Sequence, residues 1–384
     1  MTAIKNKTVA IIGGGPGGLT LARLLQMNGV EVKVYERDTH LNVRVQGATL
    51  DLHDDSGLKA LRAAGLIEAF EANYRPGADK TCVTDKHAHI VYADEGGGEG
   101  EAFRPEIDRG PLRDILLNSL QPDTIIWDSQ FVSLHQQNGG VKIEFKNGSS
   151  AYADVVIAAD GANSKIRPYI TPIKPFYSGV TVIEGSVYNA EKNSPNVYQL
   201  LNDGKIFAIE DEKTLIVGSK GDGSLTYYAG FKADEFWYKD SGIDFTDKAQ
   251  VLAWFKKEFA GWASIWDELF ENASSAFTPR PQYCMPLDQT WEALPNLTML
   301  GDAAHLMPPY AGEGVNMAML DALELAECLL NETFADTHAA IAAYEQQMRA
   351  RASEVARITL EQTAILHSAD GLTKLVAMFR GIEQ

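Results

Sequence analysis

The stretch TVAIIGGGPGGLTLARLL, residues 8–25, decides the fold. Its first part, residues 8–12, is rich in β-branched side chains and predicts a short buried strand. Residues 19–25 place apolar side chains on one helical face, and this pattern stops before Gly29. Valines then alternate over residues 30–34 as a second strand. Because two parallel strands need a crossover between them, the segment predicts a β-α-β unit.

The turn between this strand and helix is GGGPGG, residues 13–18, which satisfies the G-x-G-x-x-G pattern of dinucleotide-binding proteins. Gly13 permits a tight turn, Gly15 lets the backbone approach a pyrophosphate, and Gly18 lets the helix lie close to the strand. Taken alone, the hexapeptide is also compatible with a turn that binds nothing. Glu36 ends the second strand, where a carboxylate accepts hydrogen bonds from ribose hydroxyls and repels a 2′-phosphate. The residues therefore predict bound FAD or NAD rather than NADP.

The composition indicates a globular protein of two domains. The 384 residues exceed what one core usually organises, and 45% of them are hydrophobic against 22% charged. The net charge of −18 repels phosphate backbones and anionic lipids, so neither nucleic acid nor a membrane is an expected partner. The three cysteines are far apart, and no metal-binding motif occurs, so no disulfide and no metal site is predicted. Without a signal segment, we expect a cytoplasmic protein, and we expect a monomer.

The rest of the chain predicts an α/β fold. Residues 176–231 hold short alternating segments broken by glycine turns, which is typical of an antiparallel sheet, and residues 341–366 have a helical period. We therefore predict a Rossmann-like domain for the dinucleotide, a second domain with an antiparallel sheet, and a long C-terminal helix. The expected boundaries are 1–75, 102–172 and 284–335 for the first domain, 76–101 and 173–283 for the second, and 336–384 for a helical segment that bridges them.

Carboxylates follow two further predicted strands of the first domain. Asp160 and Gly161 come after the strand 155–159, and Gly301 and Asp302 come after the strand 297–300. Each aspartate alone is also typical of a turn or a helix cap. Side chains at the carboxyl ends of such strands face the crevice in which cofactors lie, so we expect both aspartates near the dinucleotide.

In this order, the glycine fingerprint, the Asp-Gly pair and the Gly-Asp pair resemble the three motifs of the group A flavoprotein monooxygenases, the aromatic hydroxylase type built on one FAD-binding fold. Within that family, several segments are similar to those of the tetracycline-inactivating flavin monooxygenases, whereas the sheet region matches less. These segments are GATLDLH (47–53), LRDILLNSL (112–120), GDAAHLMPPYAGEGVN (301–316) and YEQQM (344–348).

The resemblance implies a set of cofactor-binding residues. Glu36 would bind the adenosine ribose, Arg37 and Arg109 the adenine side and the pyrophosphate, and Asp302 the ribityl chain. Arg44 and Asp51 match positions near the cofactors, and Arg44 is the candidate contact for NADPH. The full set of expected cofactor-binding residues is Gly13, Gly15, Gly18, Glu36, Arg37, Arg44, Asp51, Arg109, Asp160, Asp302, Pro309, Gly312, Gly314, Val315 and Asn316.

The resemblance also implies a reaction in which the flavin is the reactive group and no side chain is catalytic. NADPH would reduce FAD, and O₂ would add to give a C4a-hydroperoxide that hydroxylates a fused-ring phenolic substrate. Tetracycline antibiotics are the first expected substrate, with inactivation as the outcome, and another polycyclic aromatic compound is the alternative. Glu184 and Lys205 fall where the tetracycline group has a substrate-contacting Gln and Arg, so we expect both at the substrate.

Of three alternative classes of protein, the residues alone leave two open. A flavin-dependent halogenase would share the fold, but its W-x-W-x-I-P segment does not occur in the chain. The second class is a non-catalytic FAD-binding redox protein, and the third is an NAD dehydrogenase with a single dinucleotide-binding domain. A reductase with two such domains would be expected to show a second glycine fingerprint, and the chain has none.

Overall fold

The first half of the fold is a parallel sheet with the predicted β-α-β unit at its centre. The computed structural model describes residues 2–41, 43, 49–96 and 104–381. The sheet has the order β17-β11-β1-β2-β7, and every neighbouring pair in it is parallel. Its strands are β1 (Thr8–Ile12), β2 (Glu31–Tyr35), β7 (Ile125–Ile126), β11 (Val155–Ala158) and β17 (Leu297–Met299). The helix α1 (Pro16–Met27) joins β1 to β2, which confirms the prediction.

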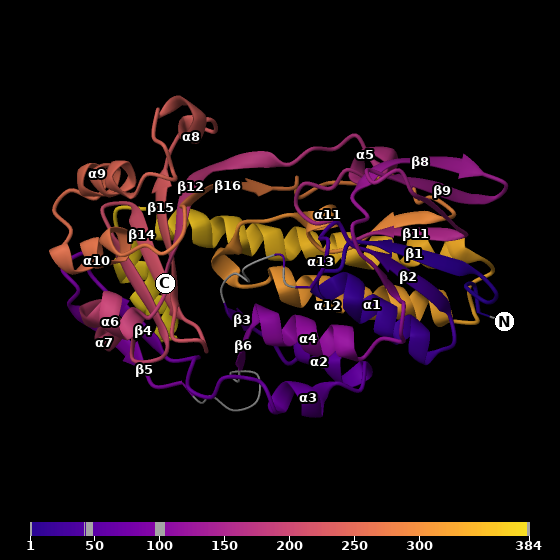
Figure 1. Cartoon of the computed structure of the whole chain (residues 1–384), viewed down its shortest axis with the longest axis horizontal. Coiled ribbons are helices and arrows are strands. Elements are labelled where there is room, and N and C mark those ends of the chain that lie inside the picture. The colour runs from indigo at the N-terminus through magenta and orange to yellow at the C-terminus, as the bar shows by residue number, and fades with distance from the viewer. Residues whose placement is uncertain (1, 42, 44–48, 97–103, 382–384) are drawn as a thin grey trace.

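Helices and two small sheets surround this parallel sheet (Figure 1). The helix α12 packs against α1, α2 and α13. Buried leucines, valines and isoleucines from the sheet and the helices form the hydrophobic core of this half. The helices in this half are α2 (Gly57–Ala63), α3 (Ile67–Glu71), α4 (Arg109–Asn118), α5 (Arg167–Ile170), α11 (Asp302–His305), η3 (Pro309–Ala311) and α12 (Gly314–Leu330). The small sheets pair β3 (Thr49–Asp51) with β6 (Glu106–Asp108), and β8 (Phe131–Gln137) with β9 (Gly140–Phe145) and β10 (Ser150–Ala153).

The second half is a seven-stranded sheet of order β16-β12-β15-β14-β13-β4-β5, as the glycine-punctuated alternation predicted. Neighbours are antiparallel except β13 and β4. Its strands are β4 (Thr81–Thr84), β5 (Ile90–Asp94), β12 (Phe176–Val187), β13 (Lys205–Glu210), β14 (Lys213–Ser219), β15 (Leu225–Lys232) and β16 (Thr278–Cys284). Its helices are α6 (Ala190–Asn193), α7 (Pro195–Leu201), α8 (Trp237–Asp240), α9 (Lys248–Glu258), η2 (Ser264–Trp266) and α10 (Asp267–Glu271).

Alternation along these strands gives the seven-stranded sheet two different faces. Ile183, Tyr227 and Leu215 belong to one aromatic-rich core with α9 and α10. The residues next to them in sequence point to the opposite face. Examples are Glu184 and Tyr228, which are paired across β12 and β15. We call this opposite face the inner face, because its charged residues interact with the parallel-sheet half, as described below.

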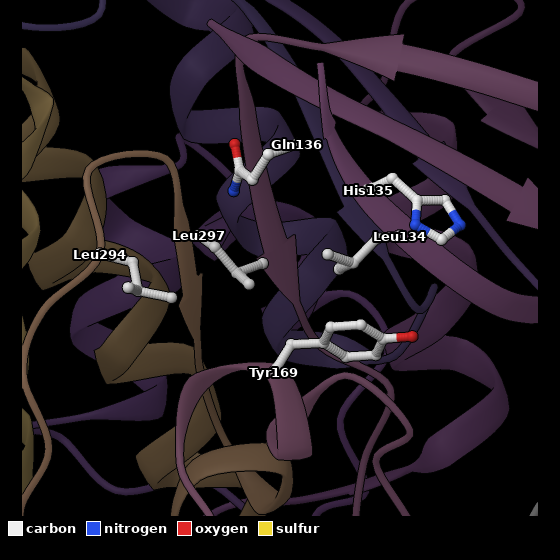
Figure 2. A pocket seen from close by; sticks show the side chains of 6 residues that line it. All are labelled: Leu134, His135, Gln136, Tyr169, Leu294 and Leu297. Carbon is white, nitrogen blue, oxygen red and sulfur yellow. The ribbon is translucent and has the colours of Figure 1, made fainter.

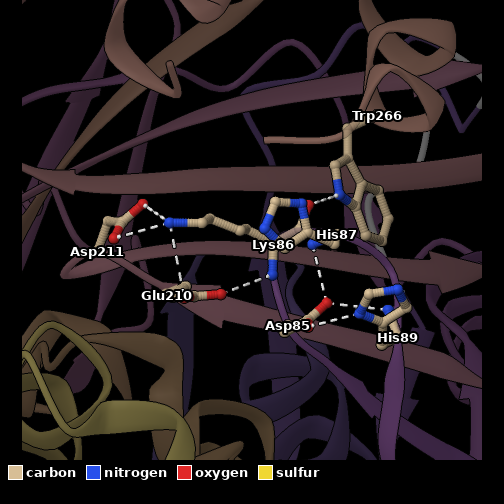
Figure 3. A network of polar contacts seen from close by, with 7 residues as sticks. All are labelled: Asp85, Lys86, His87, His89, Glu210, Asp211 and Trp266. Atoms are coloured by element: carbon tan, nitrogen blue, oxygen red, sulfur yellow. Dashed lines mark hydrogen bonds and ion pairs between the residues drawn. The ribbon is translucent and has the colours of Figure 1, made fainter. Parts of the chain in front are cut away.

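Two hairpin turns at the rim of this sheet are joined by the polar network in Figure 3. The carboxylate of Asp85 accepts hydrogen bonds from the backbone N–H groups of His87 and His89, at 2.8 and 2.9 Å. The Lys86 ammonium pairs with Asp211, and the indole N–H of Trp266 donates to the Lys86 carbonyl at 2.9 Å. These contacts fix turns, and within the described residues no cluster of His, Cys, Asp and Glu could hold a metal ion.

The C-terminal segment forms two helices where the sequence predicts one. The helix α13 (Thr337–Leu366) runs from the parallel-sheet half to the seven-stranded sheet, and α14 (Gly371–Phe379) then packs on β13 (Figure 1). Gly371, the first residue of α14, lies so close to the end of α13 that a Cβ there would be 2.8 Å from the Ile365 carbonyl oxygen, so this turn has no room for a side chain at that position. Among the described helices, none is long and apolar enough to cross a membrane.

Candidate active site

The glycine fingerprint forms a turn that has no room for a side chain at Gly13, Gly17 or Gly18. Gly13 has φ of +119°, and a Cβ on it would lie 2.1 Å from the Ala159 carbonyl oxygen. A Cβ on Gly18 would lie 2.2 Å from the Gly13 carbonyl oxygen. A Cβ on Gly15, in contrast, would have no atom of the described residues within 4 Å, and none of their side chains caps the helix α1 that begins next to it. The positive end of α1 therefore faces open space where an anion can approach.

The carboxylate of Glu36 is buried at the end of β2 and points back at this turn. Its Oε2 accepts a hydrogen bond from the Gly14 N–H at 2.7 Å, and its Oε1 accepts one from the Asp38 N–H at 3.0 Å. An acceptor fixed beside the fingerprint is the arrangement that binds a ribose in dinucleotide sites. Arg37 is exposed on the surface next to it, and Arg44 lies outside the described residues.

One arginine that the sequence analysis missed joins the two aspartate motifs. The buried Arg167 donates from Nε to the Ala303 carbonyl at 2.6 Å, and from Nη2 to the Asp302 and Ala162 carbonyls at 2.8 and 3.2 Å. It thereby holds the turn after β11 against the turn after β17. No periodicity or motif marks Arg167, so only the tertiary structure identifies it.

The aspartates themselves have room for further partners. Asp160 Oδ2 accepts from the Lys165 N–H at 2.8 Å, whereas Asp160 Oδ1 is buried and has no hydrogen-bond partner among the described residues. Burial raises the pKa of Asp302, against the opposing effect of His305, Arg109 and Arg167. A buried polar atom without a partner costs free energy, so the oxygen of Asp160 fits a site that a polar ligand completes.

The loop before α12 and the first turn of α12 contain the remaining predicted cofactor contacts. Gly312 has φ of +71°, and a Cβ on it would lie 3.1 Å from Asp51 Oδ1. The Asn316 amide donates to the Asp51 and Gly312 carbonyls at 2.9 and 3.3 Å. A Cβ on Gly314 would lie 3.9 Å from Asp302 Oδ1, so the start of α12 adjoins the Gly-Asp motif. Pro309 is exposed, while Val315 is half-buried in the first turn of α12, and no side chain of the described residues caps this helix.

His53 was not assigned a role from the sequence, yet it joins this loop to β3. Its Nε2 lies 3.0 Å from Asp51 Oδ2 and its Nδ1 lies 3.4 Å from Glu313 Oε1. Burial alone would lower the pKa of His53, but the two carboxylates outweigh it and raise the pKa to about 9. His53 is therefore an imidazolium at neutral pH that ties Asp51 to Glu313. A lone histidine in a sequence gives no sign that a carboxylate from a distant loop approaches it.

Arg109 has electrostatic partners in both halves of the molecule. Its guanidinium interacts with Asp302 of the parallel-sheet half and with Tyr228, Glu184 and Arg280 on the inner face of the other sheet. Burial lowers the pKa of Arg109, and the negative groups among these partners partly offset that effect. The two halves therefore bring their charged groups together at the first residue of α4.

The two predicted substrate residues both form ion pairs. Glu184 pairs with Arg280 across β12 and β16. Lys205, at the start of β13, pairs with the buried Glu106 of β6 and also interacts with Asp51. Lys205 thereby links the inner face to the strand pair that carries Asp51.

A separate depression lies on the outside of the parallel-sheet half, with a volume of about 510 Å³. Figure 2 shows its lining, in which Tyr169 and His135 border a largely apolar floor. The lining residues are Leu134, His135, Gln136, Tyr169, Leu294 and Leu297. None of the predicted site residues that the structure describes belongs to this lining, so we do not assign the chemistry to it.

Comparisons with known proteins show the family and the fold. The family described as FAD binding domain matches residues 6–359. A relative named monooxygenase penA, from Penicillium thymicola, is 26% identical, and the match covers 98% of this chain and 99% of that protein. A solved structure of a putative FAD-containing monooxygenase from Photorhabdus luminescens subsp. laumondii is 27% identical, with a TM-score of 0.77 over 94% of this chain and 98% of that one. The tetracycline destructase Tet(51) is similar in fold, with a TM-score of 0.73 at 19% identity over 97% of this chain and 94% of that one.

The fold and site thus define a flavoprotein of the group A hydroxylase type. The chain belongs to the FAD-binding domain family, and it is an FAD-dependent monooxygenase. The predicted fold class and the expected FAD are confirmed.

Proposed function

We propose that the protein consumes NADPH and O₂ to hydroxylate a fused-ring phenolic compound, with tetracycline antibiotics as the first substrate to test. The observation that carries this proposal is the position of Arg109, whose electrostatic partners include Asp302 and the inner-face residues Glu184, Tyr228 and Arg280. A substrate that contacts the inner face beside Arg109 would lie next to the groups proposed to hold the flavin.

The residues present fit FAD. The open space before Gly15 and the uncapped start of α1 suit the pyrophosphate, the buried Glu36 suits the adenosine ribose, and Asp302 suits the ribityl chain. When bound, FAD supplies the electron transfer and the activation of O₂, for which no amino-acid side chain is suited. The first-turn amides of Gly314 and Val315 offer a positive helix end, which would favour negative charge at the redox end of the cofactor.

On the substrate side, the chain offers a polar inner face. The Glu184 carboxylate can accept a hydrogen bond from a phenol or an ammonium group, and Tyr228 stands opposite it in register. Lys205 can place a positive charge beside an enolate or phenolate oxygen. Gly218 is the strand partner of Lys205, and no heavy atom of the described residues lies within 4 Å of where its Cβ would be, so there is open space beside Lys205.

A different polycyclic substrate is the second candidate, and the ion pairs of Glu184 and Lys205 favour it. The resemblance places a Gln and an Arg at these two positions in the tetracycline group. Here the carboxylate of Glu184 is held by Arg280 and the ammonium of Lys205 by Glu106, so each offers fewer free contacts to a ligand. A substrate whose polar groups match a carboxylate-guanidinium pair would suit this face better.

The test uses the purified flavoprotein. We expect NADPH oxidation to accelerate when a tetracycline is added, and one oxygen atom from ¹⁸O₂ to appear in the product by mass spectrometry. Product without added oxygen would refute hydroxylation. Acceleration by other fused-ring phenols but not by tetracyclines would support the second candidate. A non-catalytic redox protein would show little NADPH turnover, and a dehydrogenase would turn over without O₂.

A further inference from the structure

The Gly-Asp motif is held by one carboxylate from the helix behind it. Asp321 of α12 is fully buried, and its Oδ2 accepts a hydrogen bond from the Gly301 N–H at 2.8 Å. The same oxygen lies 2.5 Å from Nε2 of His305. Gly301 precedes the four-residue helix α11, Asp302 begins it and His305 ends it. One oxygen therefore fixes both ends of the short helix that carries the Asp302 carboxylate.

This clamp is necessary because α11 cannot define its own position. A single helical turn is not stable in isolation, and Gly301 has φ of +60°, a conformation that L residues rarely adopt. A Cβ on Gly301 would also lie 2.9 Å from the Cβ of Ala318 on α12. Contacts to α12 therefore help to set the direction in which Asp302 leaves the sheet, together with the Arg167 hydrogen bonds to the Asp302 and Ala303 carbonyls.

The charge of Asp321 is balanced from the C-terminal helix. Arg351 of α13 donates from Nη2 to Asp321 Oδ1 at 2.5 Å and from Nη1 to Glu324. Together with His305, Arg351 lowers the pKa of Asp321, against the opposing effect of burial. A buried carboxylate that loses its partner is strongly destabilised, so the clamp on α11 requires α13 to be in place.

From this arrangement we propose that Asp321 and Arg351 are positioning residues for FAD, which act through Gly301 and His305 on the carboxylate of Asp302. The inference rests on the proposed role of Asp302 as a cofactor ligand. Its consequence is that FAD affinity depends on the docking of α13, a helix that contributes no predicted cofactor contact of its own.

The test compares two substitutions to Gln on the same helix. Arg351→Gln removes the partner of Asp321. Glu345→Gln is the matched control, because Glu345 is a buried charged residue of α13 whose carboxylate accepts hydrogen bonds from Thr298 and Trp291, outside α11. FAD dissociation from each holoprotein is followed by the rise in flavin fluorescence on dilution, and the stability of each protein by urea unfolding.

We expect Arg351→Gln to raise the dissociation constant of FAD by about tenfold or more, with Glu345→Gln within about threefold of wild type even at a similar loss of stability. Arg351→Lys should recover part of the affinity. Equal effects of the two Gln substitutions, after allowance for stability, would overturn the proposal.

A double-mutant cycle separates this inference from the function it rests on. If Asp302→Asn alone leaves FAD binding unchanged, the assignment of Asp302 as a ligand fails. If Asp302→Asn weakens binding, we expect Asp321→Asn to weaken it much less in the Asp302→Asn background than in wild type. Fully additive effects would show that Asp321 does not act through Asp302 and would refute the inference. The flavin absorbance spectrum of each holoprotein provides an independent record of a changed cofactor environment.

Discussion

Raising the pH should break the link that His53 makes between β3 and the loop before α12. The pKa of His53 rises from an ordinary 6.5 to about 9 because Asp51 and Glu313 stabilise the imidazolium, against the effect of burial. Each pKa unit corresponds to about 1.4 kcal/mol, so the protonated ring stabilises the fold by about 3 kcal/mol. The sign follows from linkage: the contribution is complete below pH 6.5 and is lost as the pH rises through 9.

The assay is the free energy of unfolding in urea, measured in mildly acidic and in strongly alkaline buffer on either side of these two pKa values, for wild type and for His53→Gln. The Gln side chain does not titrate, so the variant removes this term and retains the pH dependence of the rest of the chain. We expect the difference in stability between the two proteins to shrink by about 3 kcal/mol from the acidic to the alkaline buffer. NMR of labelled histidines, with His53→Gln to assign the signal, should show that the His53 ring titrates near pH 9. A His53 ring that titrates with an ordinary pKa, or parallel pH profiles of the two proteins, would refute the reasoning.

Further predictions concern the fingerprint, the arginine between the two aspartate motifs and the inner face. Gly15→Ala should leave thermal stability nearly unchanged but weaken FAD binding, because the new Cβ enters open space before α1. Gly18→Ala should instead destabilise the fold by several kcal/mol, because its Cβ would lie 2.2 Å from a backbone carbonyl oxygen. Melting curves and FAD titration distinguish them, and equal stabilities would contradict the assignment. Arg167→Lys should lower the melting temperature and speed FAD release, because an ammonium cannot keep all three carbonyl contacts, and an unaltered release rate would count against its role. Glu184→Gln should release Arg280 and change KM for the substrate, while the affinity for FAD stays unchanged. A loss of FAD from this variant would contradict the position of Glu184 on the substrate side.

The sequence predicted the parallel-sheet half well because its signals are local. The glycine fingerprint, the strand before it and the helix after it depend on residues that are neighbours in the chain, and the structure confirms each of them. The open space at Gly15 and the buried Glu36 are likewise consequences of one β-α-β unit.

The residues that hold the site together could not be predicted in this way. Arg167, Asp321 and His53 are each paired with groups that are remote in sequence, and such a pair leaves no periodic trace. In the seven-stranded sheet, the alternation of side chains along β12 indicates which face Glu184 lies on. It does not indicate which residue of the next strand lies beside Glu184, because that depends on the register between the two strands. Its partner Arg280 is 96 residues further along the chain.

The path of the chain limits how the molecule can open. The backbone passes repeatedly between the parallel sheet and the seven-stranded sheet, and α13 and α14 join them once more at the end. A hinge that swung one half away from the other would have to bend all of these connections together, whereas hinges in proteins involve a few residues. We therefore expect entry of a large ligand to involve local displacement of short segments rather than a change in the distance between the two sheets.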